Sequence, residues 1–223
     1  TNGGMLPNWV TDVVGDVAQA TGGRVGIHAH NDTGCAVANS IAAIEGGASH
    51  VQGCINGYGE RTGNADLISV VANLELKLDH RVLPQGLLRE STRVAHAVAE
   101  VTNVPPASRQ PYVGASAFAH KAGLHASAIK VDPNLYQHLD PVEVGNDMRL
   151  LVSDMAGRAS IELKGRELGF ELSKDQIQRI TDRVKHLEAK GYTFEAADAS
   201  FELLLLEETE GARPSYFEVE SWR

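Results

Sequence analysis

The apolar positions near the N-terminal end of the chain alternate between helical and strand-like spacing. Helical spacing marks residues 7–20, 34–46 and 64–78. Short apolar runs, typical of buried strands, mark residues 24–28 and 49–54. The order helix, strand, helix, strand, helix, with a repeat of about 25 residues, predicts a parallel sheet with crossover helices. The expected fold class is therefore α/β.

Beyond residue 80, helical patterns are separated by loop-forming segments. Residues 85–103 predict a helix that ends before Pro105-Pro106, because proline lacks the N–H group that a helix interior needs. The prolines and glycines of residues 105–147 predict loops with short helices. Residues 148–169 predict a further helix with a glycine near its end.

Two more helical patterns follow. Ser173 and Gln176 stand at the spacing of a capping box, in which each side chain bonds to the backbone N–H of the other residue. The helix that they open has apolar positions at Ile177, Ile180, Val184 and Leu187. Residues 195–208 predict a last helix with an apolar stripe of Ala199, Leu203 and Leu206, and residues 216–223 alternate like a strand.

The number of strand–helix units bounds the fold. A complete (β/α)8 TIM barrel needs eight units in about 250 residues, and two are visible here. We therefore expect the C-terminal part of a TIM barrel followed by a mostly helical region, as a fragment of a longer protein. The expected parts are a barrel portion (1–80), a linker with a first helical subdomain (81–147), a second helical subdomain (148–210) and the start of a truncated C-terminal domain (211–223).

Composition excludes several classes of protein. The chain has 223 residues, of which 43% are hydrophobic, as in an ordinary globular protein. Its net charge of −9, without a basic cluster, argues against nucleic-acid binding. No apolar run approaches the roughly 20 residues of a membrane-spanning helix. Because Cys35 and Cys54 are the only cysteines, no disulfide framework is expected, and the expected compartment is the cytoplasm.

His28 and His30 stand at the carboxyl end of the first predicted strand. Residues i and i+2 of a strand point to the same side, so the two imidazoles are expected on one face. Imidazole pairs of this kind bind divalent metals and leave positions open for a substrate. The alternative is a pair of partly buried structural histidines, since a lone His-x-His is weak evidence.

The second predicted strand leads into a glycine-rich loop, residues 57–64. Its glycines allow the backbone to approach a ligand closely, while Glu60, Arg61 and Asn64 add charge and an amide. The alternative is a tight turn with a surface ion pair. A phosphate cradle is less favoured, because no helix-opening Lys-Ser/Thr follows.

Together these motifs resemble the Claisen-condensing synthases of the metallolyase superfamily, which are the isopropylmalate, homocitrate and citramalate synthases. The resemblance rests on residues 28–32, 52–64 and 119–125, and it covers essentially the whole chain. Three further segments are most similar to the citramalate branch of this family: residues 109–114, 152–158 and 191–202.

The resemblance implies a divalent metal, Zn²⁺, Mn²⁺ or Mg²⁺. His28 and His30 match the two metal-binding histidines of the family, and Asn64 matches an asparagine at or near the metal. The third protein ligand of the family, an Asp beside a catalytic Arg, belongs to a strand upstream of Thr1. Thr1 itself matches a threonine that contacts the carboxylate of the 2-oxoacid, although a simple chain end is an equal interpretation.

The resemblance also implies catalytic residues after the barrel. His125 and Tyr136 match a His and a Tyr that reach the active site of the partner subunit, so a homodimer is expected, and Asn134 lies in a stretch similar to one beside the acyl-CoA. Glu60 is expected to brace the site through an ion pair with Arg61. The structural alternatives are a polar loop residue for His125 and a packing aromatic for Tyr136.

The implied activity is that of an acyltransferase, in which acetyl-CoA and pyruvate condense to give (R)-citramalate and CoA on the route to isoleucine. A related synthase could use another 2-oxoacid. A lyase of the superfamily would cleave an acyl-CoA with a loop cysteine, and for Cys54 a reactive role is less favoured than that of a small substitute for threonine. The last alternative is an inactive fragment that only binds a partner. In the main interpretation, residues 211–223 would begin a regulatory domain.

Overall fold

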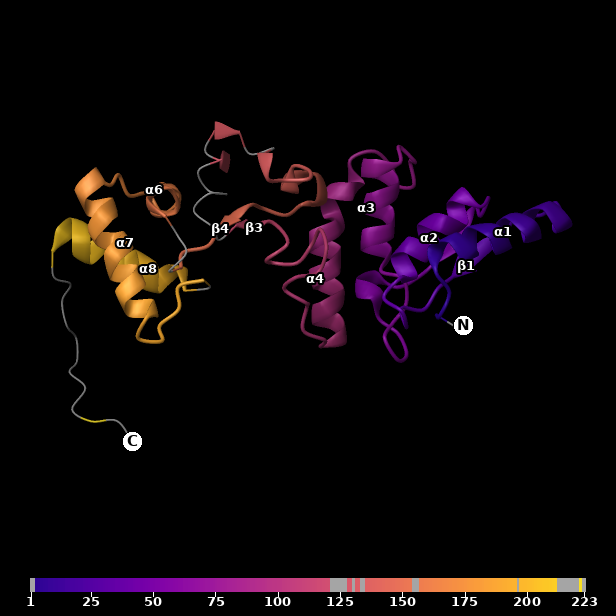
Figure 1. Ribbon diagram of the computed structural model, residues 1–223, viewed down its shortest axis with the longest axis horizontal. Coiled ribbons are helices and arrows are strands. Elements are labelled where there is room, and N and C mark those ends of the chain that lie inside the picture. Colours follow the sequence, from indigo (N-terminus) through magenta and orange to yellow (C-terminus); the bar gives the residue numbers. More distant parts are fainter. Residues whose placement is uncertain are drawn as a thin grey trace. The chain divides into compact units, whose positions relative to one another are not determined.

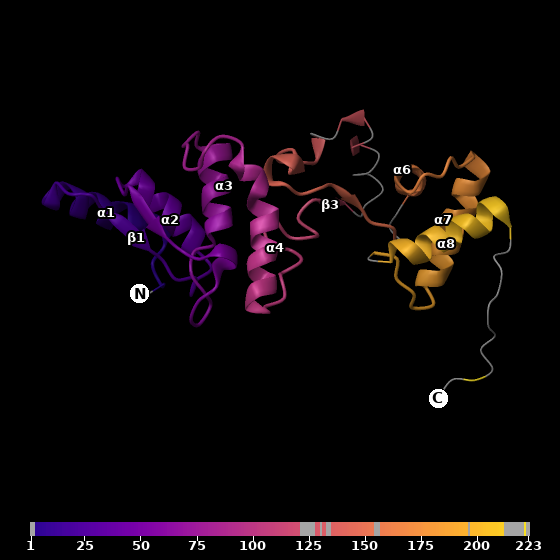
Figure 2. The same ribbon diagram turned by 180° about the vertical axis from the view of Figure 1, so that it is seen from behind.

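The computed structural model describes residues 3–120, 128–129, 131–132, 135–153, 157–195, 197–211 and 221. These residues contain seven α-helices and divide into two compact units (Figures 1 and 2). The first unit comprises residues 1–117 and 141–147, and the second comprises residues 118–140 and 148–223. No helix of the described residues is long and apolar enough to cross a membrane.

The first unit opens with the predicted alternation of helices and strands. The elements are α1 (Pro7–Thr21), β1 (Gly26–His28), α2 (Ala36–Glu45), β2 (His50–Gln52) and α3 (Leu67–Lys77). β1 and β2 pair in parallel, with Gly26 opposite His50 and His28 opposite Gln52. Both strands, their parallel pairing and the three helices are therefore confirmed, and so is the α/β class. The barrel portion and the four-part domain division stay predictions.

Small residues allow α1 and α2 to lie side by side (Figure 1). Val10 and Val14 of α1 pack against Ala42 and Ala43 of α2. At the end of α2, a Cβ on Gly46 would come within 2.7 Å of the Thr11 carbonyl oxygen, so the contact requires glycine. The close packing thus fixes α2 against α1.

The first unit continues with η2 (Leu87–Glu90) and α4 (Ser91–Thr102), which confirms the predicted helix of residues 85–103. α4 ends at Asn103, whose positive φ of 52° closes the helix before the proline pair. η1 (Ile55–Gly57) and η4 (Pro141–Val144) are single turns.

Residues 141–147 return to the first unit after the excursion of residues 118–140. Asn146 Nδ2 donates to the backbone oxygens of Tyr112 (2.9 Å) and Gly114 (3.1 Å), and Thr92 of α4 donates to Val144 O (2.8 Å). The Asn146 bonds thus join the two ends of the excursion, and the Thr92 bond attaches its return segment to α4.

The second unit contains β3 (Ala119–His120), β4 (Arg149–Leu150), α6 (Arg158–Glu167), α7 (Lys174–Glu188) and α8 (Asp198–Glu210). β4 pairs in parallel with β3, so the prediction that one helix covers residues 148–169 is wrong for its first part. Gly157 is extended, with φ of −84° and ψ of 175°, and α6 starts after it. Pairing with a segment 30 residues upstream overrides the local helical pattern.

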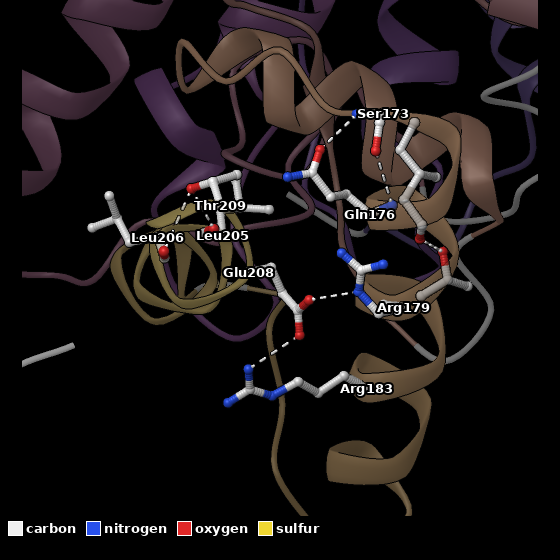
Figure 3. Close-up of polar contacts among 10 residues, drawn as sticks. Ser173, Gln176, Arg179, Arg183, Leu205, Leu206, Glu208 and Thr209 are labelled. Carbon is white, nitrogen blue, oxygen red and sulfur yellow. Dashed lines mark hydrogen bonds and ion pairs between the residues drawn. The ribbon is translucent and has the colours of Figure 1, made fainter. Parts of the chain in front are cut away.

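The capping box at the start of α7 is confirmed (Figure 3). Ser173 N donates to Gln176 Oε1 at 2.8 Å, and Gln176 N donates to Ser173 Oγ at 3.3 Å. Ion pairs then join α7 to α8: Arg179 contacts Glu208 at 3.1 Å, and Arg183 contacts Glu207 and Glu208. The arginines reach solvent and the glutamates are partly buried, and ion pairs at a protein surface typically stabilise by about 1 kcal/mol or less each.

The core of the second unit lies between α6, α7 and α8. Its fully buried side chains include Ile180, Phe201 and Leu205, each worth about 1.5–3 kcal/mol of burial. The predicted stripe of α8 is wrong, because Ala199 and Leu203 are exposed. Four consecutive leucines, residues 203–206, place a leucine on every side of the helix, so spacing alone could not select the buried face. The strand predicted for residues 216–223 lies outside the described residues except for Ser221.

Candidate metal centre at the carboxyl ends of β1 and β2

His28 is the last residue of β1, and His30 follows it by two positions. Their ring centroids lie 5.2 Å apart, with an angle of 67° between the ring planes. His30 is only 7% exposed, whereas His28 is exposed. The structure thus brings the two predicted imidazoles together, one anchored in the protein and one at the surface.

Asn64 stands directly opposite His30 in an isolated antiparallel bridge. On either side of this pair, Asn31 N donates to Gly63 O (2.8 Å) and Ala65 N donates to Ala29 O (2.9 Å). Directly opposed residues of an antiparallel pair have Cβ atoms about 4.5–5.5 Å apart and share one face. The glycine-rich loop therefore delivers the third predicted metal-site residue to the histidines.

Two glycines give the loop this path. Gly63 has a φ of +90°, and a Cβ there would lie 2.1 Å from Gly57 O. A Cβ on Gly59, whose φ is +151°, would lie 2.6 Å from Asn64 Nδ2. Positive φ values and these approaches both demand glycine, so the glycine spacing of the sequence fixes the position of the Asn64 amide.

Two buried polar atoms of this site have no hydrogen-bond partner among the described residues. They are Nδ1 of His30 and Oδ1 of Asn64. A buried polar atom without a partner costs about 1–3 kcal/mol, so such atoms call for a ligand. An imidazole nitrogen and an amide oxygen are both electron-pair donors that bind divalent cations.

The donor set of the described residues fits part of a metal site. No group of three or more His, Cys, Asp or Glu side chains within the described part of the chain could hold a metal ion. His28, His30 and the neutral Asn64 would supply three ligands without a carboxylate. With its two imidazoles, such a set suits Zn²⁺ better than Mg²⁺, which prefers oxygen ligands.

An ion pair joins the segment after β1 to the glycine-rich loop. Asp32 receives two bonds of 2.9 Å from the Arg61 guanidinium and further bonds from Thr62 Oγ1 (3.3 Å) and Gly3 N (3.2 Å). The bonds from Arg61 are the main reason why the pKa of Asp32 falls from 3.8 to about 2. Glu60 is exposed, and its charge is the smallest of the causes that raise the pKa of Arg61. Among the described residues, Asp32 is an ion-pair partner of the loop arginine that the sequence did not indicate.

A cavity of about 400 Å³ adjoins Asn64 in the first unit. Its polar lining includes Asn31, Asn56 and Arg109, none of which the sequence singled out as a site residue. Asn56 is held by bonds from its Nδ2 to Ala95 O (2.9 Å) and from Gln110 Nε2 to its Oδ1 (3.1 Å). Asn56 and Arg109 lie in two motifs of the family resemblance, and that was the only signal for them in the sequence.

The remaining predicted site residues are not all described. Thr1, His125 and Asn134 lie outside the described residues. Tyr136 belongs to the second unit and is 42% exposed. The roles predicted for these residues and for Glu60 stay predictions.

Comparison with known proteins finds two family matches, one in each part of the chain. Residues 1–98 match the HMGL-like family, and residues 112–192 match the family described as homocitrate synthase post-HMGL domain-like. The (R)-citramalate synthase of Streptomyces coelicolor is 66% identical over 100% of this chain and 42% of its own length. That of Aquifex aeolicus is 46% identical over 100% of this chain and 43% of its own length.

A more distant relative extends the comparison beyond the citramalate branch. The probable 2-isopropylmalate synthase of Methanopyrus kandleri is 38% identical over 86% of this chain and 38% of its own length. The chain thus spans less than half the length of each of these three relatives. An HMGL-like segment implies a fold of the TIM-barrel type.

Proposed function

We propose that this chain, which over residues 1–98 belongs to the HMGL-like family, is part of an enzyme that condenses acetyl-CoA with pyruvate to give (R)-citramalate and CoA. The resemblance to the isopropylmalate, homocitrate and citramalate synthases is confirmed by the matches over the whole chain. The observation that carries the proposal is the pairing of His30 with Asn64, each of which has a buried electron-pair donor atom with no hydrogen-bond partner among the described residues.

In this enzyme His28, His30 and Asn64 hold a divalent metal. When bound, the metal polarises the carbonyl group of the 2-oxoacid and makes its carbon electrophilic. The ion pair between Asp32 and Arg61 keeps the glycine-rich loop against the histidines, so that the ligands stay in place.

The residues after the barrel portion supply the proton chemistry. A base removes a proton from the methyl group of acetyl-CoA, and the resulting carbanion attacks the keto carbon of pyruvate. The former keto oxygen then takes up a proton and becomes the hydroxyl group of the product. Water then hydrolyses the thioester and releases CoA. We assign proton handling near the acyl group to His125, assisted by Tyr136, because imidazole titrates close to neutral pH. Asn134 and Thr1 are assigned to the acyl-CoA and to the 2-oxoacid carboxylate, respectively.

The chain would be the C-terminal part of the barrel with the region that follows it. Upstream strands would complete the sheet and supply the missing acidic metal ligand. The support is the share of each relative that the chain covers, 42% for the protein from Streptomyces coelicolor. A homodimer follows from the assignment of His125 and Tyr136 to the partner's active site, and the product would serve isoleucine synthesis in the cytoplasm.

The test uses the full-length protein that contains this chain. The purified protein is incubated with acetyl-CoA and, in separate reactions, pyruvate, 2-oxoisovalerate or 2-oxoglutarate, and the products are separated by chiral chromatography. The proposal predicts (R)-citramalate and an equal amount of CoA from pyruvate. Condensation with another 2-oxoacid in preference to pyruvate would assign the enzyme to a different synthase, and cleavage without condensation would assign it to the lyases.

A further inference from the structure

We propose that Cys54 is a positioning residue that sets the orientation of the Asn64 amide, so that its oxygen and not its nitrogen faces the metal. The inference rests on the proposed function only in taking the site as a metal site. It concerns a side chain that the family resemblance leaves without a role.

The central contact joins the amide to the thiol. Asn64 Nδ2 donates to Cys54 Sγ at 3.2 Å. An amide has two orientations, related by exchange of its oxygen and nitrogen, and its hydrogen-bond partners decide between them. With the NH₂ group on the sulfur, the oxygen is the buried atom that has no partner among the described residues.

The backbone of Cys54 is held in place on both sides. Cys54 follows β2, and its N–H donates to Ala65 O at 3.0 Å, while Leu67 N donates to Cys54 O at 3.0 Å. These bonds accompany a parallel bridge between Cys54 and Asp66. The thiol is thus carried by a residue whose backbone N–H and C=O groups are both hydrogen-bonded to the opposite strand segment.

The other side of the amide is closed as well. Gly59 approaches so closely that a Cβ there would meet Asn64 Nδ2 at 2.6 Å and Asn64 Cγ at 2.9 Å. The amide therefore has little room to shift sideways, and its remaining freedom is the exchange of oxygen and nitrogen. Cys54 is the side chain that removes this freedom.

A second observation supports a cation site on the oxygen side of the amide. His30, paired with Asn64 through the backbone, is only 7% exposed, and its buried Nδ1 also lacks a partner among the described residues. Two facing residues thus each present an electron-pair donor. If the amide were reversed, its NH₂ group would replace one donor with two partly positive hydrogens, which would repel a metal ion.

The substitutions have distinct expected effects. Cys54→Ala removes the acceptor, leaves the amide free to reverse, and should weaken metal binding about 10–100-fold, the usual effect of removing a residue that orients a ligand. Cys54→Ser keeps an acceptor and should bind metal more like the unsubstituted protein than like Cys54→Ala. Cys35→Ala is the control, because the Cys35 thiol donates to Thr33 O (3.6 Å) and does not contact Asn64.

The experiment measures the affinity of the metal-free, full-length protein for Zn²⁺ by competition with a chromogenic chelator, without substrates. Thermal unfolding of each metal-free variant checks that it is folded, and Cys54→Val serves as a second variant that lacks an acceptor if Cys54→Ala does not fold. A failure of the proposed condensation would appear in product formation and not in this affinity, so the two failures can be told apart.

A double-mutant cycle with Asn64→Ala tests whether Cys54 acts through the amide. The positioning role predicts that Cys54→Ala lowers Zn²⁺ affinity in the unsubstituted protein and has no further effect once Asn64 is alanine. The proposal is overturned if Cys54→Ala binds Zn²⁺ as tightly as Cys35→Ala does, or if its effect persists in the Asn64→Ala protein. It is also overturned if Cys54→Ser binds Zn²⁺ normally but loses turnover, since the thiol itself would then take part in the chemistry.

Discussion

Arg61 and Asp32, which are 29 residues apart in the sequence, form a bidentate ion pair with two N–O distances of 2.9 Å. Asp32 belongs to the segment that follows β1, and Arg61 belongs to the glycine-rich loop. The pair therefore ties together the two motifs that supply the proposed metal ligands, and its strength depends on the charge of Asp32.

The stability of the protein should depend on pH through Asp32. Its pKa is about 2 in the folded protein, below the ordinary 3.8, so the ionised carboxylate stabilises the fold fully above about pH 4, and this contribution is lost as the pH falls toward 2. Thermal midpoints of the full-length protein and its Asp32→Asn variant should differ by a constant amount above about pH 4 and converge below it.

Arg61→Gln provides the control for this prediction. Hydrogen bonds from Arg61 are the largest cause of the lowered pKa of Asp32, so in the Arg61→Gln protein the effect of Asp32→Asn should depend much less on pH. If Asp32→Asn lowered the thermal midpoint of the otherwise unsubstituted protein by more as the pH fell below 4, the stabilising role of the Asp32 carboxylate would be contradicted.

Gly63→Ala should disturb the site more than Gly34→Ala. Both glycines have positive φ, +90° and +74°, so both substitutions introduce backbone strain of about 1–2 kcal/mol. Only at Gly63 would the added Cβ collide, 2.1 Å from Gly57 O, whereas Gly34 has open space within 4 Å. Chemical denaturation and Zn²⁺ titration of the two full-length variants should show a larger loss of both stability and metal affinity for Gly63→Ala. Equal losses would show that the collision is relieved without moving Asn64.

Asn146→Ala should loosen the base of the excursion that carries His125 and Tyr136. It removes the bonds to Tyr112 O and Gly114 O, which should cost about 1–3 kcal/mol locally. Hydrogen exchange should quicken in residues 112–117 and 141–147. Asn146→Asp keeps the shape of the side chain but loses both N–H donors, so exchange should quicken in the same residues. Asp147→Ala, at the exposed neighbouring position, should leave exchange unchanged. Unchanged exchange in both Asn146 variants would show that other contacts hold the segment.

His125→Ala should lower turnover of the full-length enzyme by roughly a hundredfold or more, the usual scale of general acid–base catalysis, with normal metal content. If active sites are shared between subunits, mixed dimers of the inactive His125→Ala and His28→Ala proteins should regain activity, because one site then receives intact residues from both chains. Verified mixed dimers without activity would exclude sharing, and normal turnover of His125→Ala would exclude its catalytic role.

Local patterns predicted most of the elements that carry the site. The helices α1–α4 and the strands β1 and β2 follow from apolar spacing and from glycine and proline stops, and the capping box at Ser173 follows from two residues alone. His28 and His30 could be placed on one side because strand geometry relates neighbours two positions apart.

The errors and omissions involve contacts between distant residues. β4 forms because residues 119–120 pair with it, and the buried face of α8 is set by α7, which the leucine run could not reveal. The sequence also did not indicate that Arg61 pairs with Asp32 or that the Asn64 amide bonds to Cys54. Motif matching could suggest that these residues belong to one site, but only the folded chain shows which atoms meet.

The metal content of the full-length protein tests the central claim most directly. After dialysis against metal-free buffer, elemental analysis should find one divalent metal ion per chain in the unsubstituted protein and none in the His28→Ala/His30→Ala variant. The matched control is His50→Ala/His80→Ala, which replaces two exposed histidines of the same unit and should keep its metal. Full metal content in a folded His28→Ala/His30→Ala protein would contradict the account.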